Sequence, residues 1–242
     1  MIEVKGFKHR EKIIGILGGM GPEATADFFL KVIKATPAKK DQDHLRIIVD
    51  NNPKIPDRSL ALLDKGESPL AQLKETICNL EKAGAEIIVI PCNTALHYYD
   101  ALQESANMPI INMISETAAY IYQNFPLTKK IGLLATDGTI ATRIYHKAIK
   151  EIELMVPVEE QQKGVMESIY GEQGIKAGFT QGSSRLEILN VAKTMLKMGV
   201  EAILIGCTEI SLVLKPEDLP VPLIDPTQIL AEVAVKKAGI SA

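Results

Sequence analysis

The sequence predicts an α/β protein made of two similar domains, each with a mostly parallel sheet flanked by helices. Short apolar runs that suit buried strands alternate with amphipathic helical segments along most of the 242-residue chain, as they do in parallel α/β folds. The same succession begins again near residue 130, with matching motifs in matching order. This repetition suggests that the two domains are pseudo-symmetric and face each other.

In the first half, each expected element has a local sequence signal. The run IIGIL is continuous and apolar, which is typical of a parallel strand covered on both faces. Pro22 suits the first turn of the helix that follows, and Gly84 lies just beyond the end of a later amphipathic helix. We expect strands at residues 13–17, 45–50, 87–90 and 108–111, and helices at residues 24–33 and 70–82.

Three pairs of segments support an internal duplication. The segment EKIIGILGGMGPEAT resembles KKIGLLATDGTIAT, with Gly15 aligned to Gly132 at an offset of 117. A shift of 115 residues aligns Cys92 with Cys207, and MPIIN pairs with VPLID at an offset of 113. Because the three matches keep the same order, they favour duplication over coincidence.

Composition and charge argue against several classes of protein. The net charge is −3 and no long basic run is present, so nucleic acid is not an expected partner. No stretch reaches the roughly 20 apolar residues of a membrane helix, and the charged N-terminal segment does not resemble a secretory signal. Three scattered cysteines without a CxxC pattern suit neither a disulfide scaffold nor a zinc site. We expect a cytoplasmic protein with reduced thiols and no membrane partner.

The sharpest motif is a cysteine that twice follows an apolar run, as Cys92 in IIVIPCNTA and as Cys207 in AILIGCTEI. Functional residues of parallel sheets gather beyond the carboxyl ends of the strands, so both thiols are expected there. Each should begin a helix, whose dipole lowers the thiol pKa. The alternative is a pair of small buried side chains. The duplication, and the polar pairs Asn93-Thr94 and Thr208-Glu209, favour two thiols that flank one small molecule.

A glycine-rich turn supports a rival interpretation. Gly19, Gly21 and Ala24 fit a loose dinucleotide-binding fingerprint between a strand and a helix. Asp50 ends the second strand, where an acid that binds ribose would lie. A nucleotide-binding oxidoreductase is therefore an alternative, although it leaves the paired cysteines unexplained.

The residues alone do not decide the roles of two basic side chains, Arg58 and Lys176, or of the segment that contains Lys176. Arg58, in IPDR, could hold a carboxylate with two hydrogen bonds, and Lys176 lies in the glycine-rich segment at residues 159–184. Taken singly, each is more readily explained as a solvated surface cation. The segment itself is either a flexible connection or a lid over a site. Cys78 is expected in the core, and the histidines are expected at the surface: His9, His44, His97 and His146.

Taken together, the motifs ILGGMGPEAT, IPDR, PCNTA, LATDGT, GIKAG and GCTEI resemble the cofactor-independent aspartate/glutamate racemase superfamily, and its aspartate racemase branch in particular. Glutamate racemases usually have an Asp-Ser turn in place of GGMGP and GCTH in place of GCTEI. The resemblance implies two α/β domains with the active site between them and a C-terminal segment that returns to the first domain. We therefore expect one domain from residues 1–112 plus 226–242 and another from residues 113–225. The resemblance also implies a homodimer.

The resemblance implies racemisation without pyridoxal phosphate, any other cofactor or a metal. Cys92 and Cys207 would act as a thiolate/thiol pair on opposite faces of Cα, interconverting L- and D-aspartate. Aspartate and glutamate differ by one methylene, which pocket depth decides, so glutamate stays open as a substrate. The implied substrate-binding residues are Asn93, Thr94, Thr136 and Thr208 for the backbone groups, Glu209 for the ammonium group, and Arg58 and Lys176 for the side-chain carboxylate.

Other functions remain as alternatives. Maleate isomerases, hydantoin racemases and malonate decarboxylases resemble the same scaffold, and some of them use a single cysteine. A further alternative is a protein that binds amino acids without catalysing their racemisation.

Overall fold

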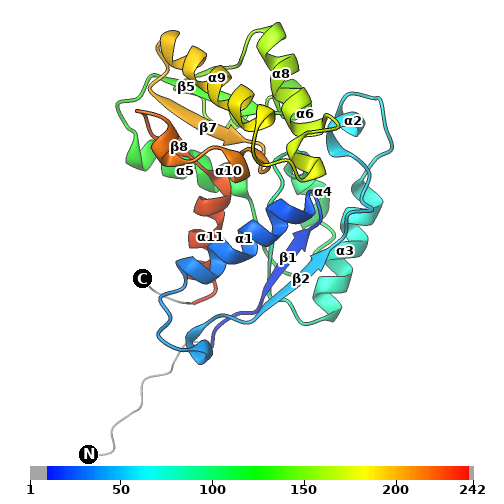
Figure 1. Ribbon diagram of the computed structural model, residues 1–242. Helices are drawn as coiled ribbons and strands as arrows, with labels where there is room; N and C mark the ends of the chain where they lie inside the picture. The colour runs from blue at the N-terminus through cyan, green and yellow to red at the C-terminus, as the bar shows by residue number, and fades with distance from the viewer. Residues whose placement is uncertain (1–9, 240–242) are drawn as a thin grey trace, which may run out of the picture.

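The computed structural model describes residues 10–239 and contains two four-stranded parallel sheets (Figure 1). One sheet has the order β2 (Ile47–Asn51), β1 (Ile14–Gly18), β3 (Ile87–Val89) and β4 (Ile110–Ile111). The other has the order β6 (Glu153–Met155), β5 (Lys130–Ala135), β7 (Ala202–Gly206) and β8 (Leu223–Ile224). Each strand of the first sheet thus has a counterpart at the same position in the second. The predicted α/β class with two similar halves is confirmed.

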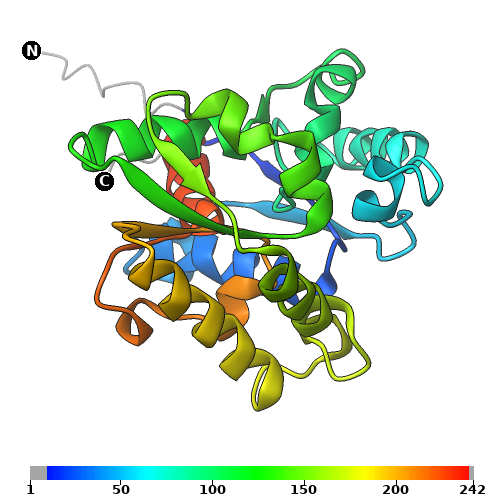
Figure 2. The same ribbon diagram turned by 90° about the horizontal axis from the view of Figure 1, so that it is seen from above.

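Helices cover the sheets and connect their strands. The first half contains α1 (Pro22–Ala35), α2 (Arg58–Leu62), α3 (Leu70–Lys82) and α4 (Tyr99–Gln103). The second half contains α5 (Met113–Asn124), α6 (Asp137–Thr142), α7 (Ile144–Ala148), α8 (Glu159–Tyr170), α9 (Ser183–Lys197) and α10 (Ile210–Val213). The last helix is α11 (Pro226–Lys237). Figure 2 shows α8 and α9 on one side of the second sheet and the green helices α5 to α7 on the other.

The central strands are buried along their whole length, as the continuous apolar runs predict. All five residues of β1 and all five of β7 are buried. The aligned glycines explain how helices and neighbouring strands approach so closely. A Cβ atom at Gly15 would lie 2.7 Å from the Cβ of Ala85, and one at Gly132 would lie 2.8 Å from Cδ1 of Ile203. Both halves therefore need glycine at the same place, because a larger side chain would collide with the core.

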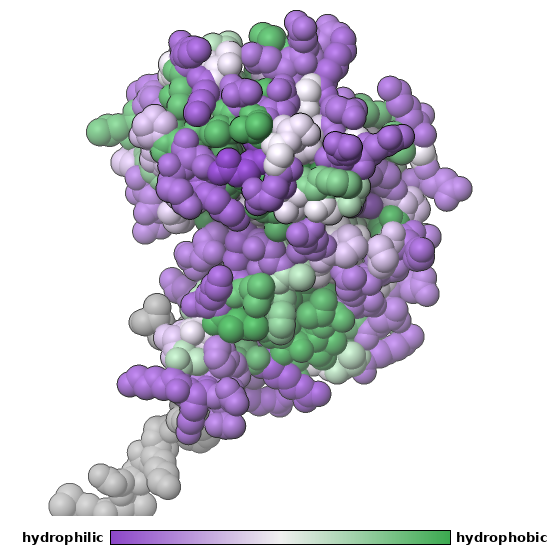
Figure 3. All heavy atoms as spheres, in the orientation of Figure 1, coloured by the Kyte–Doolittle hydropathy of each residue, from purple (hydrophilic) through white to green (hydrophobic). Residues whose placement is uncertain are grey.

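The edge strand β2 differs from this pattern. Its residues are only partly buried or exposed, and Val49 is 41% exposed. Figure 3 shows a hydrophobic area over the part of the molecule where α1, β1 and β2 lie in Figure 1. Leu30 on α1 is also exposed. The apolar sequence of β2 therefore does not mean that both of its faces are covered.

The glycine-rich segment is more ordered than a plain flexible connection. Its first part forms α8, whose residues Val165 and Ile169 are fully buried. Gly164 lies where a Cβ atom would come 2.5 Å from the Glu187 carboxylate on α9, so this glycine allows α8 and α9 to pack closely. For residues 159–170 the flexible alternative is wrong, because the helix buries an apolar face.

The expectation for Cys78 is also wrong. The buried face of α3 carries Leu73, Ile77 and Leu80, and Cys78 lies beside that face, where it is only half-buried. His97 is exposed, and His44 and His146 are half-buried. His9 lies outside the described residues.

The last helix joins both halves. α11 packs against α1 and against α5. Because α11 contacts a helix from each half, the domain boundaries at residues 112 and 225 stay a prediction. Within residues 10–239, no helix combines the length and the apolar character that crossing a membrane requires.

Lys31 on α1 is the polar centre of this junction. Its ammonium group lies 2.8 Å from Oδ2 of Asp225 and 2.7 Å from Oδ2 of Asp27. It also donates hydrogen bonds to Oγ1 of Thr227 and to Oγ of Ser211, at 2.7 and 3.4 Å. Burial lowers the pKa of Lys31, but Asp225 and Asp27 raise it more, so the amine stays charged.

We predict that Lys31→Met lowers the free energy of unfolding by about 2–4 kcal/mol, because two carboxylates lose their shared cation in a part-buried place. Lys34→Met is the matched control: it makes the same substitution at an exposed position of α1, and its effect should stay within about 0.5 kcal/mol. Urea denaturation followed by circular dichroism measures both. Equal effects in the two variants would contradict the role of Lys31.

Candidate active site

Cys92 and Cys207 line one narrow cavity between the two halves. Cys92 follows β3 and Cys207 follows β7, which are equivalent strands of the two sheets. Both side chains are buried, with 4% and 6% exposure. The open volume is about 20 Å³, room for about one water molecule. The lining residues are Met20, Arg58, Cys92, Asn93, Thr94, Thr136, Tyr170, Lys176, Gly206, Cys207, Thr208 and Glu209.

All nine residues that the sequence suggested for the site belong to this lining, so the fold brings every one of them together. Three lining residues were not foreseen: Met20, Tyr170 and Gly206. Asp50 and the described histidines are not among them. Asp50 instead accepts a 3.4 Å hydrogen bond from the side chain of Asn79.

The wall around Cys92 is built by a short 3₁₀ turn at Thr94–Tyr98. A 3.5 Å hydrogen bond joins the Cys92 thiol and the Thr94 hydroxyl. Asn93 accepts a 2.5 Å hydrogen bond from the hydroxyl of Tyr145, a fully buried residue on α7. The other end of this amide, Nδ2, is buried and has no hydrogen-bond partner among residues 10–239. Asn93 therefore has a donor free for a ligand.

Arg58 approaches the same side from the start of α2. Asp57 caps this helix by accepting a 2.8 Å hydrogen bond from the Leu60 amide. The guanidinium donates to the backbone oxygens of Ile55 and Pro56, at 3.2 and 2.9 Å. Its Nε is buried without a partner in the described part of the chain. Burial lowers the pKa of Arg58, but Cys92 and Asp57 raise it, and the net shift is upward.

The wall around Cys207 carries an ion pair. Lys176, on a 3₁₀ turn at Ile175–Ala177, lies with its Nζ 2.5 Å from Oε1 of Glu209. The other carboxylate oxygen accepts hydrogen bonds from the Cys207 thiol and the Thr208 hydroxyl, both at 3.1 Å. Glu209 is 3% exposed. Burial raises the pKa of Glu209, but Lys176 and the hydrogen bonds from Cys207 and the backbone together lower it more, so the carboxylate is ionised. Burial likewise lowers the pKa of Lys176, and Glu209 reverses the shift.

This arrangement corrects the expected acidity of Cys207. A helix dipole was expected to lower the thiol pKa, but burial and the neighbouring Glu209 carboxylate raise it well above its ordinary value. Lys176 opposes them only in part. The helix that follows, α10, has only four residues, so its dipole is weak. Cys207 is therefore held as a thiol.

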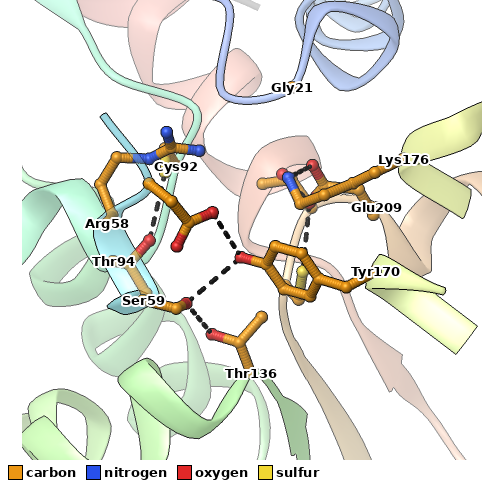
Figure 4. A network of polar contacts seen from close by, with 12 residues as sticks. Gly21, Arg58, Ser59, Cys92, Thr94, Thr136, Tyr170, Lys176 and Glu209 are labelled. Carbon is orange, nitrogen blue, oxygen red and sulfur yellow. Dashed lines mark hydrogen bonds and ion pairs between the residues drawn. The ribbon is translucent and has the colours of Figure 1, made fainter. Parts of the chain in front are cut away.

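Tyr170, the last residue of α8, contacts residues of both walls of the cavity (Figure 4). Its hydroxyl donates to Oδ2 of Asp57 at 3.1 Å and lies 3.4 Å from Oγ of Ser59. Ser59 in turn donates a 3.1 Å hydrogen bond to Thr136, which caps α6 in the second half. The ring of Tyr170 lies under the Lys176 ammonium, with Nζ 5.3 Å from its centroid. The sequence signal for Tyr170 was only its place next to a glycine-rich turn.

The GGMGP turn closes the site from the first half. Thr25 fixes it by accepting a hydrogen bond from the Gly19 amide at 2.9 Å and donating one to the Gly21 carbonyl at 2.8 Å. A Cβ atom at Gly21 would lie 3.0 Å from Oε1 of Glu209. The glycine thus admits the Lys176–Glu209 pair, which Figure 4 shows below it. No cluster of three or more His, Cys, Asp or Glu suited to a metal occurs within residues 10–239.

We predict that the reaction of Cys207 with iodoacetamide becomes faster with rising pH to well beyond the usual thiol pKa of about 8.5, because only the thiolate reacts. In urea, Cys207 loses burial and Glu209, so its rate should level off near the ordinary value. Peptide mass spectrometry reads the rate at Cys207 separately from the other cysteines. A folded-state plateau at or below the urea plateau would contradict the raised pKa.

Comparison with known proteins places the chain in a family. The family model described as Asp/Glu/Hydantoin racemase matches residues 17–234. The broad specificity amino-acid racemase RacX of Bacillus subtilis (strain 168) is 30% identical over 233 residues, which cover 92% of this chain and 96% of that protein.

Solved structures agree with the sequence comparison. An aspartate racemase from Picrophilus torridus superposes with a TM-score of 0.84 at 33% identity, over 94% of both chains. An aspartate racemase homologue from Pyrococcus horikoshii OT3 has a TM-score of 0.73 at 26% identity, over 95% of this chain and 100% of that one. The chain is therefore a member of the Asp/Glu/hydantoin racemase family.

Proposed function

We propose that this protein is an amino-acid racemase that interconverts L- and D-aspartate by a two-base mechanism, with glutamate as the other candidate substrate. The observation that carries the proposal is the pair of thiols, Cys92 and Cys207, which come from equivalent strands and line one narrow cavity. Similarity to an aspartate racemase and to an amino-acid racemase of broad specificity supports the reaction class.

In this mechanism each thiol serves one face of the substrate. One sulfur, as thiolate, removes the Cα proton, and the other, as thiol, delivers its proton to the opposite face. The two sulfurs have then exchanged protonation states, so a proton must return before the next turnover in the same direction. Cys207 holds its proton next to Glu209, which suits it as the proton donor of the first turnover.

The transition state carries negative charge on the α-carboxylate as Cα becomes carbanion-like. Preorganised donors in a water-poor cavity stabilise such charge strongly. Suitable donors here are the unpartnered Nδ2 of Asn93 and the hydroxyls of Thr94, Thr136 and Thr208. In our proposal these groups hold the substrate's backbone atoms while the thiols act on Cα.

Arg58 and Lys176 would bind the side-chain carboxylate, and Glu209 would bind the ammonium group. The unpartnered Nε of Arg58 supports this role, because a guanidinium with an unused N–H can donate a hydrogen bond to a buried carboxylate. One observation favours a wider substrate range: an outer cavity of about 300 Å³ shares Arg58, Lys176 and Glu209 with the thiol cavity. Its apolar walls, which include Ile55 and Leu212, could accept longer side chains.

The proposal is tested by incubating the purified protein with L-aspartate in D₂O without added cofactor. We expect Cα deuterium, followed by NMR, to appear together with D-aspartate, followed by chiral chromatography. A panel with glutamate, alanine and longer amino acids decides the substrate range. If aspartate, glutamate and the rest of the panel all stay inert, racemisation is refuted, and the isomerase, decarboxylase and binding-protein alternatives gain.

We predict that Cys92→Ala and Cys207→Ala each lower racemisation at least about a hundredfold, because each removes the acid or base for one face of Cα. Cys78→Ala is the matched control: it removes a half-buried thiol on α3 and should leave the rate nearly unchanged. Full activity in either of the first two variants would end the two-base mechanism.

We predict that Arg58→Ala lowers the preference for aspartate over alanine by about tenfold to a hundredfold, since a charge-assisted contact to the side-chain carboxylate is lost. The ratio of kcat/KM for the two amino acids measures this preference. Arg58→Lys keeps the charge without the forked donors and should lie between. If Arg58→Ala left the ratio of kcat/KM for aspartate and alanine unchanged, binding of the side-chain carboxylate by Arg58 would be refuted.

A further inference from the structure

The Lys176–Glu209 pair stands between two cavities. The inner one, of about 20 Å³, contains the thiols, and the outer one, of about 300 Å³, lies beside the GGMGP turn. Arg58, Lys176 and Glu209 line both. A molecule that passes from the outer cavity to the thiols therefore has to pass these three side chains. The inner cavity is far too small for an amino acid, so the side chains around it have to rearrange when one binds.

Lys176 is already paired with a carboxylate of the protein, that of Glu209. Its Nζ lies 2.5 Å from Oε1 of Glu209, whose side chain is 5% exposed. A substrate carboxylate can take Lys176 only by displacing Glu209 or by sharing the ammonium group with it. Sharing would leave two buried negative charges side by side, which is costly. Displacement is the simpler route.

Glu209 can lose its contact with Lys176 while the rest of its carboxylate stays bound. Its other oxygen, Oε2, is held by the Cys207 thiol and the Thr208 hydroxyl at 3.1 Å each. Both are neutral donors, so a displaced Glu209 still needs a cation. An amino acid brings one, its α-ammonium group. A dicarboxylic amino acid therefore carries both charges needed to replace the pair, whereas alanine or leucine brings the ammonium group but no second carboxylate for Lys176.

We propose that Glu209 is a specificity-determining residue that occupies Lys176 in place of the substrate's side-chain carboxylate, and that a dicarboxylic amino acid enters by exchanging partners. Its side-chain carboxylate takes Lys176, and its ammonium group takes Glu209. This inference rests on the proposed function and adds to it a reason for a preference for amino acids with two carboxylates. Gly21 leaves the room that the pair needs, since a Cβ atom there would lie 3.0 Å from Oε1 of Glu209 and 3.9 Å from Nζ of Lys176.

The test is the affinity of succinate, a dicarboxylate that has no ammonium group and cannot be racemised. Isothermal titration calorimetry measures its Kd on the wild-type protein and on Glu209→Gln. We expect Glu209→Gln to bind succinate about tenfold tighter, because no carboxylate competes for Lys176 and none is left without a cation. Loss of simple charge repulsion would raise the affinity whether or not Lys176 is present, so no gain, or an equal gain in a Lys176→Gln background, would refute the exchange.

Two further variants make the result specific. Glu160→Gln removes an exposed carboxylate of α8 and should leave the Kd of succinate unchanged, which controls for net charge. In a Lys176→Gln background, adding Glu209→Gln should bring no gain, because the contested cation is gone. Should Glu209→Gln fail to fold, Glu209→Asp withdraws the carboxylate by one methylene and should also tighten succinate binding.

Succinate binding and racemisation can fail separately. A wild-type protein that racemises aspartate, together with a Glu209→Gln variant that gains no succinate affinity, would overturn the exchange alone. A protein that racemises nothing, but whose Glu209→Gln variant gains affinity, would overturn the proposed function and keep the exchange of carboxylates at Lys176.

Discussion

A buried carboxylate is stable only beside a positive charge, and the site is arranged around the pair that Glu209 forms with Lys176. Lys176 lies against Glu209 and above the ring of Tyr170. Burial, together with the hydrogen bond that Cys207 donates to this carboxylate, keeps the proton on the thiol. The GGMGP turn passes so close to the pair that only glycine fits at residue 21 without crowding it. One ion pair therefore contributes to the protonation of a cysteine, lies against a tyrosine ring and comes close to a glycine turn of the other half.

The fold is duplicated, but its charges are not. The two sheets repeat one strand order, and the two cysteines follow equivalent strands. Arg58 supplies positive charge beside Cys92, whereas Glu209 supplies negative charge beside Cys207. A symmetric scaffold brings one thiol from each half to the same cavity, and an asymmetric charge distribution surrounds the two thiols differently. Both properties suit a reaction that takes a proton from one face and returns one to the other.

Polar contacts between the halves fix the width of the cavity. Tyr145 reaches Asn93, Ser59 reaches Thr136, and Tyr170 reaches Asp57. Lys31 holds α1 to the start of α11 at a distance from the thiols. Because each contact joins segments far apart in the chain, the cavity depends on the packing of both halves at once. Its small open volume is a property of that packing and not of any single motif.

The sequence by itself determined the class of fold and the similarity of its two halves, because these follow from hydrophobic periodicity and from motifs that are contiguous in the chain. The nine candidate site residues were predicted from short motifs, most of them through the resemblance to a racemase family. Only the tertiary structure decided the acidity of Cys207, since burial and the charge of Glu209 outweigh a helix end that proved to be very short. Tyr170 and the half-buried position of Cys78 were likewise not readable from local pattern. Desolvation and charge pairing depend on residues brought together from distant segments. A sequence motif indicates which groups are candidates for the reaction, and the folded surroundings set the acidity of a group such as the Cys207 thiol.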